Sequence, residues 1–512
     1  TAPETPAEAI VAANPRVFLP VVISHEAALP ENLFFVAPSG SDSNPGTYSR
    51  PWRTIQKAAN TLVAGQTVKI LPGTYYAKFT PMNSGTAAAY ITYTADPDTV
   101  VLDGAGVSLS DSAKGDGLVQ IQGKSYIKVQ NLNLRNSTQN CVNISESSSG
   151  AGRSGYVEVT GLNIWNCMEA GIRARFSDHI LIKDNTINHV NYSSGIGLWW
   201  SNNVTVDHNT ITNARIYHNC QGAHEEVLTI AGTNTFEVKN NTLDFTESNP
   251  PGYCSISDRL GITVKESSYN GGVYSNTIMH LNAAAIYLDA WHAGADGTPT
   301  LNHINIYRNK IRDSAGIIIG AEKSDGVVEY IDIFNNVLIN TSFVGINIRK
   351  AYGDGLRKNI NIYNNTIFGA LREGGNGGAG IYVTTSHLAS NNANKPIIIR
   401  NNISMFYFLS DGSGHFSQIA AGNSTIASMI AADHNLVSGP QNCSFEYPNC
   451  VEVGNRTIAD PESVFSDPAD YDLHLKNGSP AIDSGVSVSI VGSDFDDIPR
   501  SDDYDIGAYE FR

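Results

Sequence analysis

The sequence predicts an all-β fold, a right-handed parallel β-helix with a helix-containing N-terminal cap and an irregular C-terminal cap. Two observations carry this prediction. A short apolar segment followed by asparagine recurs through the middle of the chain, and each repeat holds a second strand that usually begins with Gly-Ile. The segments are β-branched and alternate with a period of two, and no helical period of 3.6 is present. Strands this short bury a core only by stacking on copies from neighbouring repeats.

The recurring asparagine is expected to be structural. An asparagine in the left-handed region permits a tight bend between two strands. Stacked side-chain amides can then hydrogen-bond from one coil to the next as a ladder. The positions in this row are Asn185, Asn209, Asn241, Asn276, Asn309, Asn336, Asn365 and Asn402, with Asn136 and Asn166 fitting earlier turns.

Three regions are expected along the chain. Residues 1–31 are rich in Pro, Ala and Glu and are interpreted as a linker left after processing. Residues 32–432 form the β-helix with its N-terminal cap, which includes a helix at about Thr54–Leu62. Residues 433–512 lose the repeat, gain Asp, Pro and Gly, and are expected to form a C-terminal cap packed on the last coils.

Composition excludes some functions. The 512 residues include 33 Lys and Arg against 49 Asp and Glu, giving a net charge of −16. This balance argues against nucleic-acid binding, which needs a basic surface. No apolar run reaches the roughly 18 residues of a membrane span. No glycine-rich phosphate motif links a strand to a helix, so no organic cofactor is expected. We expect a monomer that is secreted or displayed at the cell surface.

The six cysteines lack CxxC or zinc-binding spacing, and their even number favours an oxidising compartment. Cys443 and Cys450 close a short loop and are expected to form a disulfide. Cys220 and Cys254 occupy matching positions on adjacent coils, where a bridge would hold two loops above one strand face. Cys141 and Cys167 are either a further pair between coils or stacked buried thiols.

The two ends of the chain carry a family resemblance. The segment VAPSGSDSNPGT…PWRTIQKAAN…GQTVKILPGTYY resembles the N-terminal cap of secreted bacterial pectate-lyase-like β-helix proteins, a set that contains polysaccharide lyases and glycoside hydrolases. The ending SPAIDSG…DIGAYEF is similar to the tail of large bacterial β-helix surface proteins. The resemblance covers nearly the whole chain and is specific for the fold, but one fold hosts many chemistries.

The Gly-Ile strands predict one functional face. When they are aligned on their first residue, positions two and four face the core, and positions three and five form outward columns. The fifth column contains Arg175, Trp199, Lys265, Asp289, Gly320, Arg349 and Thr384. The third contains Arg173, Gly197, Thr263, Tyr287, Ile318, Asn347 and Tyr382. The segment CQGAHEEVLTIAG does not fit this frame and is expected to contribute His224, Glu225 and Glu226 at its start.

This face gathers charged and aromatic side chains, which suit sugars because flat aromatic rings stack on sugar C–H faces. The candidate catalytic residues are Asp289, Glu322, Lys265, Glu226 and Arg349. The candidate substrate-binding residues are Trp199, Trp200, His224, Glu225, Arg259, Glu266, Tyr287, Trp291, His292, Lys323 and Lys350.

Three functions remain open from the sequence. The first is a glycoside hydrolase of a polysaccharide or oligosaccharide, with Asp289 and Glu322 as the carboxylate pair. The second is a lyase that eliminates at a uronate, with Lys265 or Arg349 as base. Calcium on Asp289 with Glu266 or Glu322 would suit that reaction, although no tight Asp-Asp pair lies in these strands. The third is a non-catalytic carbohydrate-binding surface protein.

Overall fold

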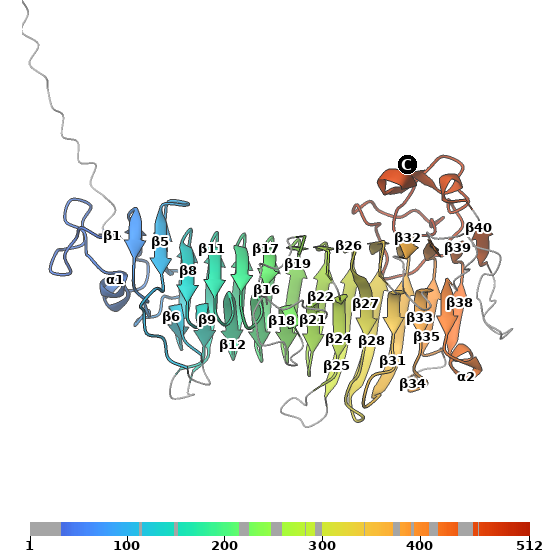
Figure 1. Ribbon diagram of the computed structural model, residues 1–512, viewed down its shortest axis with the longest axis horizontal. Helices are drawn as coiled ribbons and strands as arrows, with labels where there is room; N and C mark the ends of the chain where they lie inside the picture. Colours follow the sequence, from blue (N-terminus) through green and yellow to red (C-terminus); the bar gives the residue numbers. More distant parts are fainter. Residues whose placement is uncertain are drawn as a thin grey trace, which may run out of the picture.

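A computed structural model describes residues 32–111, 115–147, 152–214, 225–246, 259–281, 283–291, 299–342, 344–371, 379–390, 394–408, 418–438, 454–458 and 460–512. Three long parallel sheets run side by side along an elongated body, as Figure 1 shows. Between residues 91 and 421, each coil contributes one strand to each sheet in turn, so strands that are neighbours in a sheet come from successive coils. The parallel β-helix predicted from the repeat is therefore confirmed.

Sheet A follows the order of the coils. Its strands are β1 (Leu33–Val36), β2 (Thr67–Ile70), β4 (Ile91–Ala95), β7 (Ser125–Gln130), β10 (Ser154–Thr160), β13 (Ser177–Lys183), β16 (Asn202–Asp207), β19 (Asn234–Lys239), β22 (Tyr269–Tyr274), β25 (Thr300–Tyr307), β28 (Val327–Phe334), β31 (Leu356–Tyr363), β35 (Ile397–Arg400) and β38 (Ile430–Asp433), with β34 (Leu388–Ala389) also paired to β31.

Sheet B continues past the boundary expected at residue 433. Its strands are β3 (Gly73–Tyr75), β5 (Val100–Asp103), β8 (Asn133–Ser137), β11 (Asn163–Cys167), β14 (Thr186–Val190), β17 (Thr210–Ala214), β20 (Thr242–Asp244), β23 (Thr277–Met279), β26 (Lys310–Arg312), β29 (Val337–Ile339), β32 (Thr366–Leu371), β36 (Ile403–Phe408), β39 (Leu436–Ser438) and β40 (Arg456–Ile458).

Sheet C contains the Gly-Ile strands. Its strands are β6 (Gly117–Gln122), β9 (Asn140–Ser145), β12 (Ile172–Arg175), β15 (Ile196–Trp199), β18 (Glu225–Ala231), β21 (Arg259–Lys265), β24 (Ala284–Asp289), β27 (Ala315–Ile319), β30 (Val344–Ile348), β33 (Ala379–Val383) and β37 (Ile419–Ala421).

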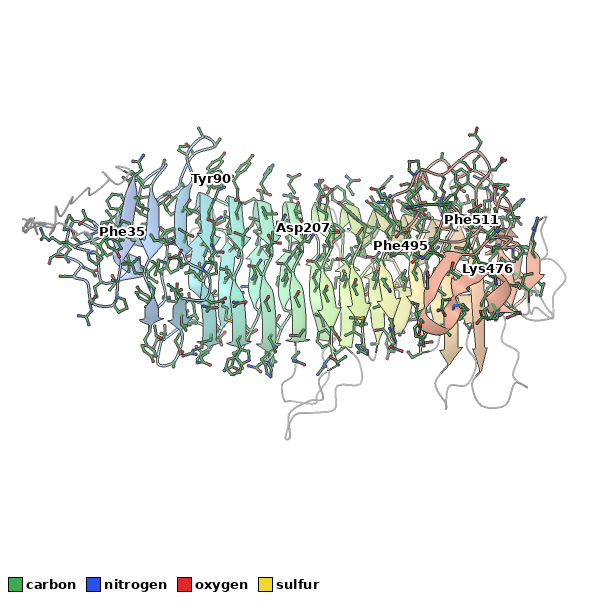
Figure 2. All side chains as sticks on the ribbon, turned by 90° about the horizontal axis from the view of Figure 1, so that it is seen from above. Phe35, Tyr90, Asp207, Lys476, Phe495 and Phe511 are labelled. Atoms are coloured by element: carbon green, nitrogen blue, oxygen red, sulfur yellow. A yellow bond between two sulfur atoms is a disulfide. The ribbon has the colours of Figure 1, made fainter. Side chains whose placement is uncertain are left out.

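The interior is a stack of like apolar side chains. In sheet C, Ile172, Ile196 and Leu228 pair in register and are fully buried, and the column continues through Ile262 and Ile286. Burying one such side chain stabilises the fold by about 1.5–3 kcal/mol. Figure 2 shows side chains filling the body along its length. Because every coil repeats the same column positions, the core has no break between the described coils.

A ladder of asparagine amides joins the coils at the turn between sheets A and B. Each Nδ2 donates to the Oδ1 of the next asparagine over 2.8 to 3.0 Å, from Asn185 through Asn402 and on to Asn435 and Asn455. The same Nδ2 of Asn241 also donates to the carbonyl of Val206. The polar groups of this buried row are thus satisfied, as buried amides require.

Two details of the predicted ladder were wrong. The residue with positive φ is the one before each ladder asparagine, for example Asn240 (φ 55°) before Asn241 and Ser275 (φ 54°) before Asn276. The bend is therefore made by the preceding residue, which leaves the ladder amide free to bond along the axis. Asn136 and Asn166 lie in a second, shorter ladder with Asn191, joined over 2.9 Å at each step.

The two ends of the body differ. At the N-terminal end, α1 (Ile55–Thr61) lies where the sequence predicts a helix, with the Thr54 hydroxyl accepting from the Lys57 N–H at its start. The C-terminal segment lies against the side of the last coils (Figure 1). It contains η2 (Pro461–Ser463), β41 (Phe465–Asp467), η3 (Pro468–Asp470) and β42 (Asp472–Leu475), and the short helix α2 (Ser424–Ala427) precedes it.

Side-chain contacts attach this segment to the β-helix. Arg500 is buried and donates to the side chains of Asn335 and Glu510. Asn364 donates to the carbonyl of Asp505. The attachment therefore uses the turn residues that precede the ladder asparagines, on the outside of the ladder. Among the described residues, no helix is long and apolar enough to cross a membrane.

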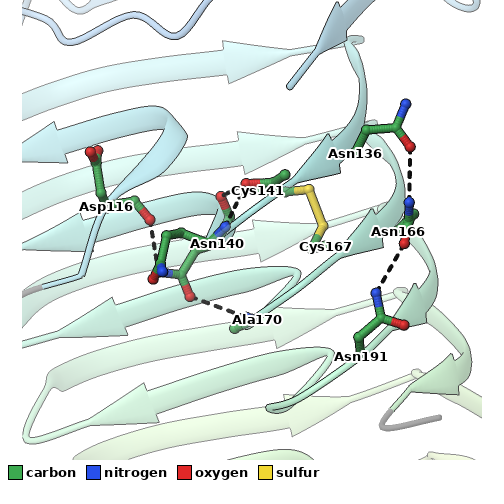
Figure 3. The surroundings of a disulfide bond; sticks show 10 residues. Asp116, Asn136, Asn140, Cys141, Asn166, Cys167, Ala170 and Asn191 are labelled. Carbon is green, nitrogen blue, oxygen red and sulfur yellow. Dashed lines mark hydrogen bonds between the residues drawn. A yellow bond between two sulfur atoms is a disulfide. The ribbon is translucent and has the colours of Figure 1, made fainter. Parts of the chain in front are cut away.

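One disulfide joins adjacent coils. Cys141 of β9 is bonded to Cys167 at the end of β11, next to the shorter amide ladder, as Figure 3 shows. The structure thus resolves the alternative left open for these two cysteines in favour of a bridge. The expected pairs Cys220–Cys254 and Cys443–Cys450, and the linker 1–31, lie outside the described residues.

Candidate functional site

The outward columns of sheet C match the sequence alignment. Register pairs Arg175 with Trp199 and Lys265 with Asp289. Gly320 and Arg349 follow directly after β27 and β30. One expectation was wrong: the coil that was excluded from the frame fits it, because β18 places Thr229 and Ala231 in the columns between Trp199 and Lys265. In this strand Val227 and Leu228 stand where the neighbouring strands have Gly-Ile, so the sequence alignment did not recognise its register.

The centre of this face holds four residues that we call the carboxylate cluster: Asp289, Glu322, Tyr287 and Arg349. Asp289 ends β24, and Glu322 lies three residues after β27 on the next coil. The backbone N–H of Glu322 donates to Asp289 Oδ1 over 2.8 Å. Both carboxylates are buried, at 4% and 6% exposure. The structure therefore brings together the two carboxylates that the sequence pairs.

Tyr287 and Arg349 surround the Glu322 carboxylate. The Tyr287 hydroxyl donates to Glu322 Oε1 over 2.5 Å, and Arg349 Nη2 lies 3.8 Å from the same oxygen. The Arg349 guanidinium also lies over the Tyr287 ring at 5.5 Å. A hydroxyl donor and a nearby cation both favour the ionised form of a carboxylate. Glu322 is thus held in place by a hydroxyl donor and lies beside a cation.

Gly320 makes room for this arrangement. A Cβ at this position would lie 2.6 Å from the Tyr287 hydroxyl oxygen, closer than any real contact permits. The tyrosine therefore crosses the next strand over a glycine before it reaches Glu322. The break in the fifth column at Gly320 is a consequence of this crossing.

The environment of Asp289 differs from that of Glu322. Burial, with a smaller contribution from the charge of Glu322, raises the pKa of Asp289 to about 7, although the Glu322 N–H, Lys265 and Arg357 oppose this rise. A carboxyl group with a raised pKa beside a second carboxyl group is a common arrangement for general acid catalysis. Asp289 is the member that holds a proton near neutral pH.

A buried cation lies behind the cluster. The Arg357 side chain is fully buried, donates to Asp354 Oδ1 over 2.5 Å, and donates to the backbone carbonyl of Arg349. Thr385 also donates to Asp354. This group fixes the segment that carries Arg349. No sequence pattern marks Arg357, because it belongs to β31 of sheet A and reaches the site from behind.

Lys265 and Glu226 form an ion pair one coil away from Asp289. Lys265 Nζ lies 2.6 Å from Glu226 Oε1, and the Thr229 hydroxyl donates to Glu226 Oε2 over 3.0 Å. Ser194 and Thr229 exchange a further hydrogen bond of 2.6 Å. Glu226 is therefore held by Thr229 of its own strand and by Lys265 of the next strand. Lys265 is in turn the neighbour of Asp289 in the fifth column.

Several other predicted binding residues make contacts elsewhere on sheet C and its turns. The Lys323 ammonium lies 5.6 Å from the centre of the Trp291 ring. Lys350 is exposed, and Arg259 and Glu266 are buried, with the Arg259 guanidinium 5.3 Å from the Phe245 ring. His224, His292 and the side chain of Glu225 lie outside the described part of the chain.

Trp199 and Trp200 line a separate hollow, which we call the Arg–Trp groove. It has a volume of about 400 Å³ and lies at the outward ends of β12 and β15, beside the turns that lead into β9, β12 and β15. Its lining residues are Asp111, Gly115, Gln139, Asn140, Glu169, Arg173, Arg175, Ser193, Trp199 and Trp200. The sequence columns contain both arginines, but the turn residues Gln139 and Glu169 carry no such signal.

The described carboxylates of this face do not form a metal site. Within the described ranges, no group of three or more His, Cys, Asp or Glu side chains is arranged to hold a metal ion. Asp289 accepts from the Glu322 N–H, and the Glu322 carboxylate accepts from Tyr287.

Comparison with known proteins agrees with this architecture. Residues 34–241 match the model of a family described as Pel9A-like, right handed beta helix region. This stretch is similar to a Pel9A-like β-helix. The resemblance to pectate-lyase-like proteins and the right-handed parallel β-helix are thereby confirmed.

Individual relatives are more distant. The uncharacterized protein YwoF of Bacillus subtilis strain 168 is 30% identical over 164 residues, which cover 32% of this chain and 30% of that protein. The structure of XylC in complex with xylose covers 93% of this chain and 98% of its own, with 10% identity and a TM-score of 0.51. Pectate lyase Pel9A covers 94% and 96%, with 14% identity and a TM-score of 0.47. At these identities the likeness concerns the fold.

Proposed function

We propose that the protein is a secreted glycoside hydrolase that cleaves a polysaccharide or oligosaccharide on the outer face of sheet C. The observation that carries this proposal is the pair Asp289 and Glu322, two adjacent carboxyl groups in unlike environments. Hydrolysis of a glycosidic bond uses one carboxylic acid to protonate the leaving oxygen and one carboxylate to activate water or attack the sugar.

The roles follow from the contacts. Asp289, whose pKa is raised to about 7, is the acid that donates its proton to the glycosidic oxygen. Glu322 is the second carboxyl group of the pair, positioned by the hydroxyl of Tyr287 and the guanidinium of Arg349. Once Asp289 has lost its proton, Lys265 in the adjacent column position and the Glu322 N–H stabilise the new charge.

The comparisons support a carbohydrate substrate. The matching family model is named for Pel9A, and the neighbour of similar length was solved with xylose. The disulfide between Cys141 and Cys167 supports secretion, since such bonds persist in oxidising compartments.

A lyase is the second candidate, favoured by the presence of Lys265 and Arg349 on the same face. A lysine must be uncharged to accept a proton, and the Glu226 carboxylate lies 2.6 Å from Lys265 Nζ. Arg349 lies beside Glu322 in the same way, and an arginine stays protonated in proteins. These ion pairs favour the hydrolase over the lyase.

The test is a panel of polysaccharides with two measurements. New reducing ends without the ultraviolet absorbance of an unsaturated uronate indicate hydrolysis, and that absorbance indicates elimination. Binding without either product would support the non-catalytic alternative. The decisive variants are Asp289→Asn and Lys265→Ala.

Sheet A offers matched controls for both variants. Asp332 also has a pKa raised by burial and accepts from an amide, Asn361, over 2.8 Å. Lys358 pairs with Glu329 over 3.4 Å. Asp332→Asn and Lys358→Ala should leave activity unchanged. Loss of activity in Lys265→Ala together with normal activity in Asp289→Asn would contradict the hydrolase.

A further inference from the structure

The Arg–Trp groove combines donors, acceptors and flat rings in a fixed arrangement. Its charged lining residues are two arginines, Arg173 and Arg175, and two acids, Asp111 and Glu169. Glu169 and Glu146 both act electrostatically on Arg173. The charges of the lining are therefore balanced. A groove of this composition offers no net attraction to a phosphate or a uronate, whereas sugar hydroxyls both donate and accept and can use both kinds of side chain.

The tryptophan rings are held in place before any ligand arrives. The Trp199 ring lies directly over Gly197, where a Cβ would be 2.1 Å from a ring carbon, and the Arg173 guanidinium lies 5.7 Å from its centre. The Trp200 ring stacks on Phe176 at 5.2 Å and 14°, with Arg175 5.1 Å from Trp200. Rings that are already ordered lose little further entropy when a ligand binds.

The wall of the groove is fixed covalently. The disulfide joins Cys141, next to Asn140, to Cys167, two residues before Glu169 (Figure 3). The Asn140 side chain donates to the Asp116 carbonyl and accepts from the Ala170 N–H, and the Glu169 N–H donates to the Gln139 carbonyl over 3.2 Å. The turns that carry the polar lining residues are thus tied to each other.

The groove and the carboxylate cluster share one column of sheet C. Trp199 and Asp289 occupy equivalent positions on β15 and β24, with β18 and β21 between them. Three strand spacings correspond to about 14 Å along the axis of the β-helix. A saccharide of several units that lies along this axis reaches both places, and a short one does not.

We infer that the Arg–Trp groove is a second sugar-binding site, which takes an uncharged sugar unit of a chain whose other part lies at the carboxylate cluster. This inference extends the proposed function and rests on it, because the other part of the saccharide is placed at the carboxylate cluster. It names the substrate class as neutral saccharides long enough to span the two sites.

The test uses the full chain carrying Asp289→Asn, so that no ligand is cleaved during titration calorimetry. The probes are neutral hexasaccharides of glucose, xylose and mannose, and hexagalacturonate as the charged comparison. At least one neutral hexasaccharide is expected to bind, and hexagalacturonate to bind about tenfold more weakly. Adding Trp199→Ala should weaken binding of the neutral sugar about tenfold or more, the usual cost of losing an aromatic anchor.

The matched control is Trp165→Ala, since Trp165 is 47% exposed on β11 of sheet B. That substitution should change affinity less than twofold. Glu169→Gln, which keeps the shape of the side chain but upsets the charge balance, should weaken the neutral sugar and narrow the difference from hexagalacturonate. It also serves if Trp199→Ala fails to fold.

Three results would overturn the inference: no binding by any probe, equal effects of Trp199→Ala and Trp165→Ala, or tighter binding of hexagalacturonate than of every neutral sugar. Failure of the proposed function looks different. If the wild-type protein cleaves nothing while Trp199→Ala still abolishes binding, the groove is a sugar-binding site but the proposed hydrolase activity is wrong. If the protein hydrolyses neutral saccharides and Trp199→Ala has no effect, the proposed hydrolase activity is supported but the groove is not a sugar-binding site.

Discussion

The Arg–Trp groove and the carboxylate cluster occupy the same outward columns of sheet C but offer different chemistry. In the groove, arginines and acids balance each other and the side chains remain partly exposed. In the cluster, Asp289 and Glu322 are buried side by side, with cations behind and beside them. Identical backbone positions thus produce a surface suited to binding in one place and a desolvated acid in the other. The neighbouring coils, rather than the strand itself, decide which.

The largest expected effect is on kcat, and it should distinguish the carboxylate cluster from the groove. Asp289→Asn should lower kcat about 100-fold or more, because a positioned general acid contributes roughly 10²–10⁴. Trp199→Ala should instead raise KM for long substrates and leave kcat for short ones unchanged. Steady-state kinetics on a long and a short saccharide measure both. A loss of kcat in Trp199→Ala on short substrates would remove the distinction between binding and chemistry.

The second expectation concerns pH. Because the folded state raises the pKa of Asp289 to about 7, it binds a proton more tightly than the unfolded chain does. The contribution of Asp289 to stability is therefore present below about pH 4 and is lost as pH rises to about 7. The loss amounts to at most about 4 kcal/mol.

Asp289→Asn should remove this dependence, since an amide still accepts from the Glu322 N–H. Urea unfolding at pH 5 and pH 8 should show the variant gaining stability relative to wild type at pH 8. Hydrolysis by the wild type should decline above about pH 7 as the acid ionises. Equal pH dependence in variant and wild type would show that Asp289 is not the group that titrates.

The third expectation concerns the groove. The bond between Cys141 and Cys167 closes a sequence separation of 26 residues, so its removal should cost about 3–4 kcal/mol in the free energy of unfolding. A Cys141→Ser, Cys167→Ser protein should bind the neutral hexasaccharide more weakly while keeping kcat on short substrates. Denaturant unfolding and calorimetry measure the two effects. A fall in kcat equal to the fall in affinity would mean that the regions are coupled.

The smallest effect is expected at Tyr287. Tyr287→Phe removes the hydroxyl that donates to Glu322, and a hydrogen bond to a charged group contributes about 1.5–3 kcal/mol. We expect kcat to fall about tenfold with sugar affinity at the groove unchanged. Tyr382→Phe, in the same outward column on β33, is the control. A similar loss in both variants would indicate a general effect on sheet C.

The fold could be predicted from the sequence, and so could some of the residues in the groove and in the carboxylate cluster. Period-two alternation and the spacing of the asparagines predict the coils because each coil repeats the same positions. The columns place Asp289 beside Lys265 correctly, since register in a parallel stack follows from aligned strand starts. The pairing of Glu322 with Asp289 could also be predicted, although Glu322 lies after the end of β27.

Other features depend on contacts between coils and could not be predicted. Arg357 reaches the site from sheet A, and Glu169 and Gln139 enter the groove from turns whose conformation no repeat specifies. The Gly320 position depends on a tyrosine of the previous coil. The register of β18 could not be predicted because Val227 and Leu228 replace the Gly-Ile pair of the neighbouring strands. The position of Glu226 in the site becomes visible only through its ion pair with Lys265.

The asparagine ladder also has a consequence for how cooperatively the molecule unfolds. Each amide bonds the next, so the row acts as a continuous seam whose links strengthen one another. Asn241 is the link between the coils of the groove and those of the cluster. Asn241→Ala should open the seam there, and hydrogen exchange should then show the two halves protected to different degrees. Wild-type protein should lose protection in both halves together, so that the seam makes one cooperative unit of two working regions.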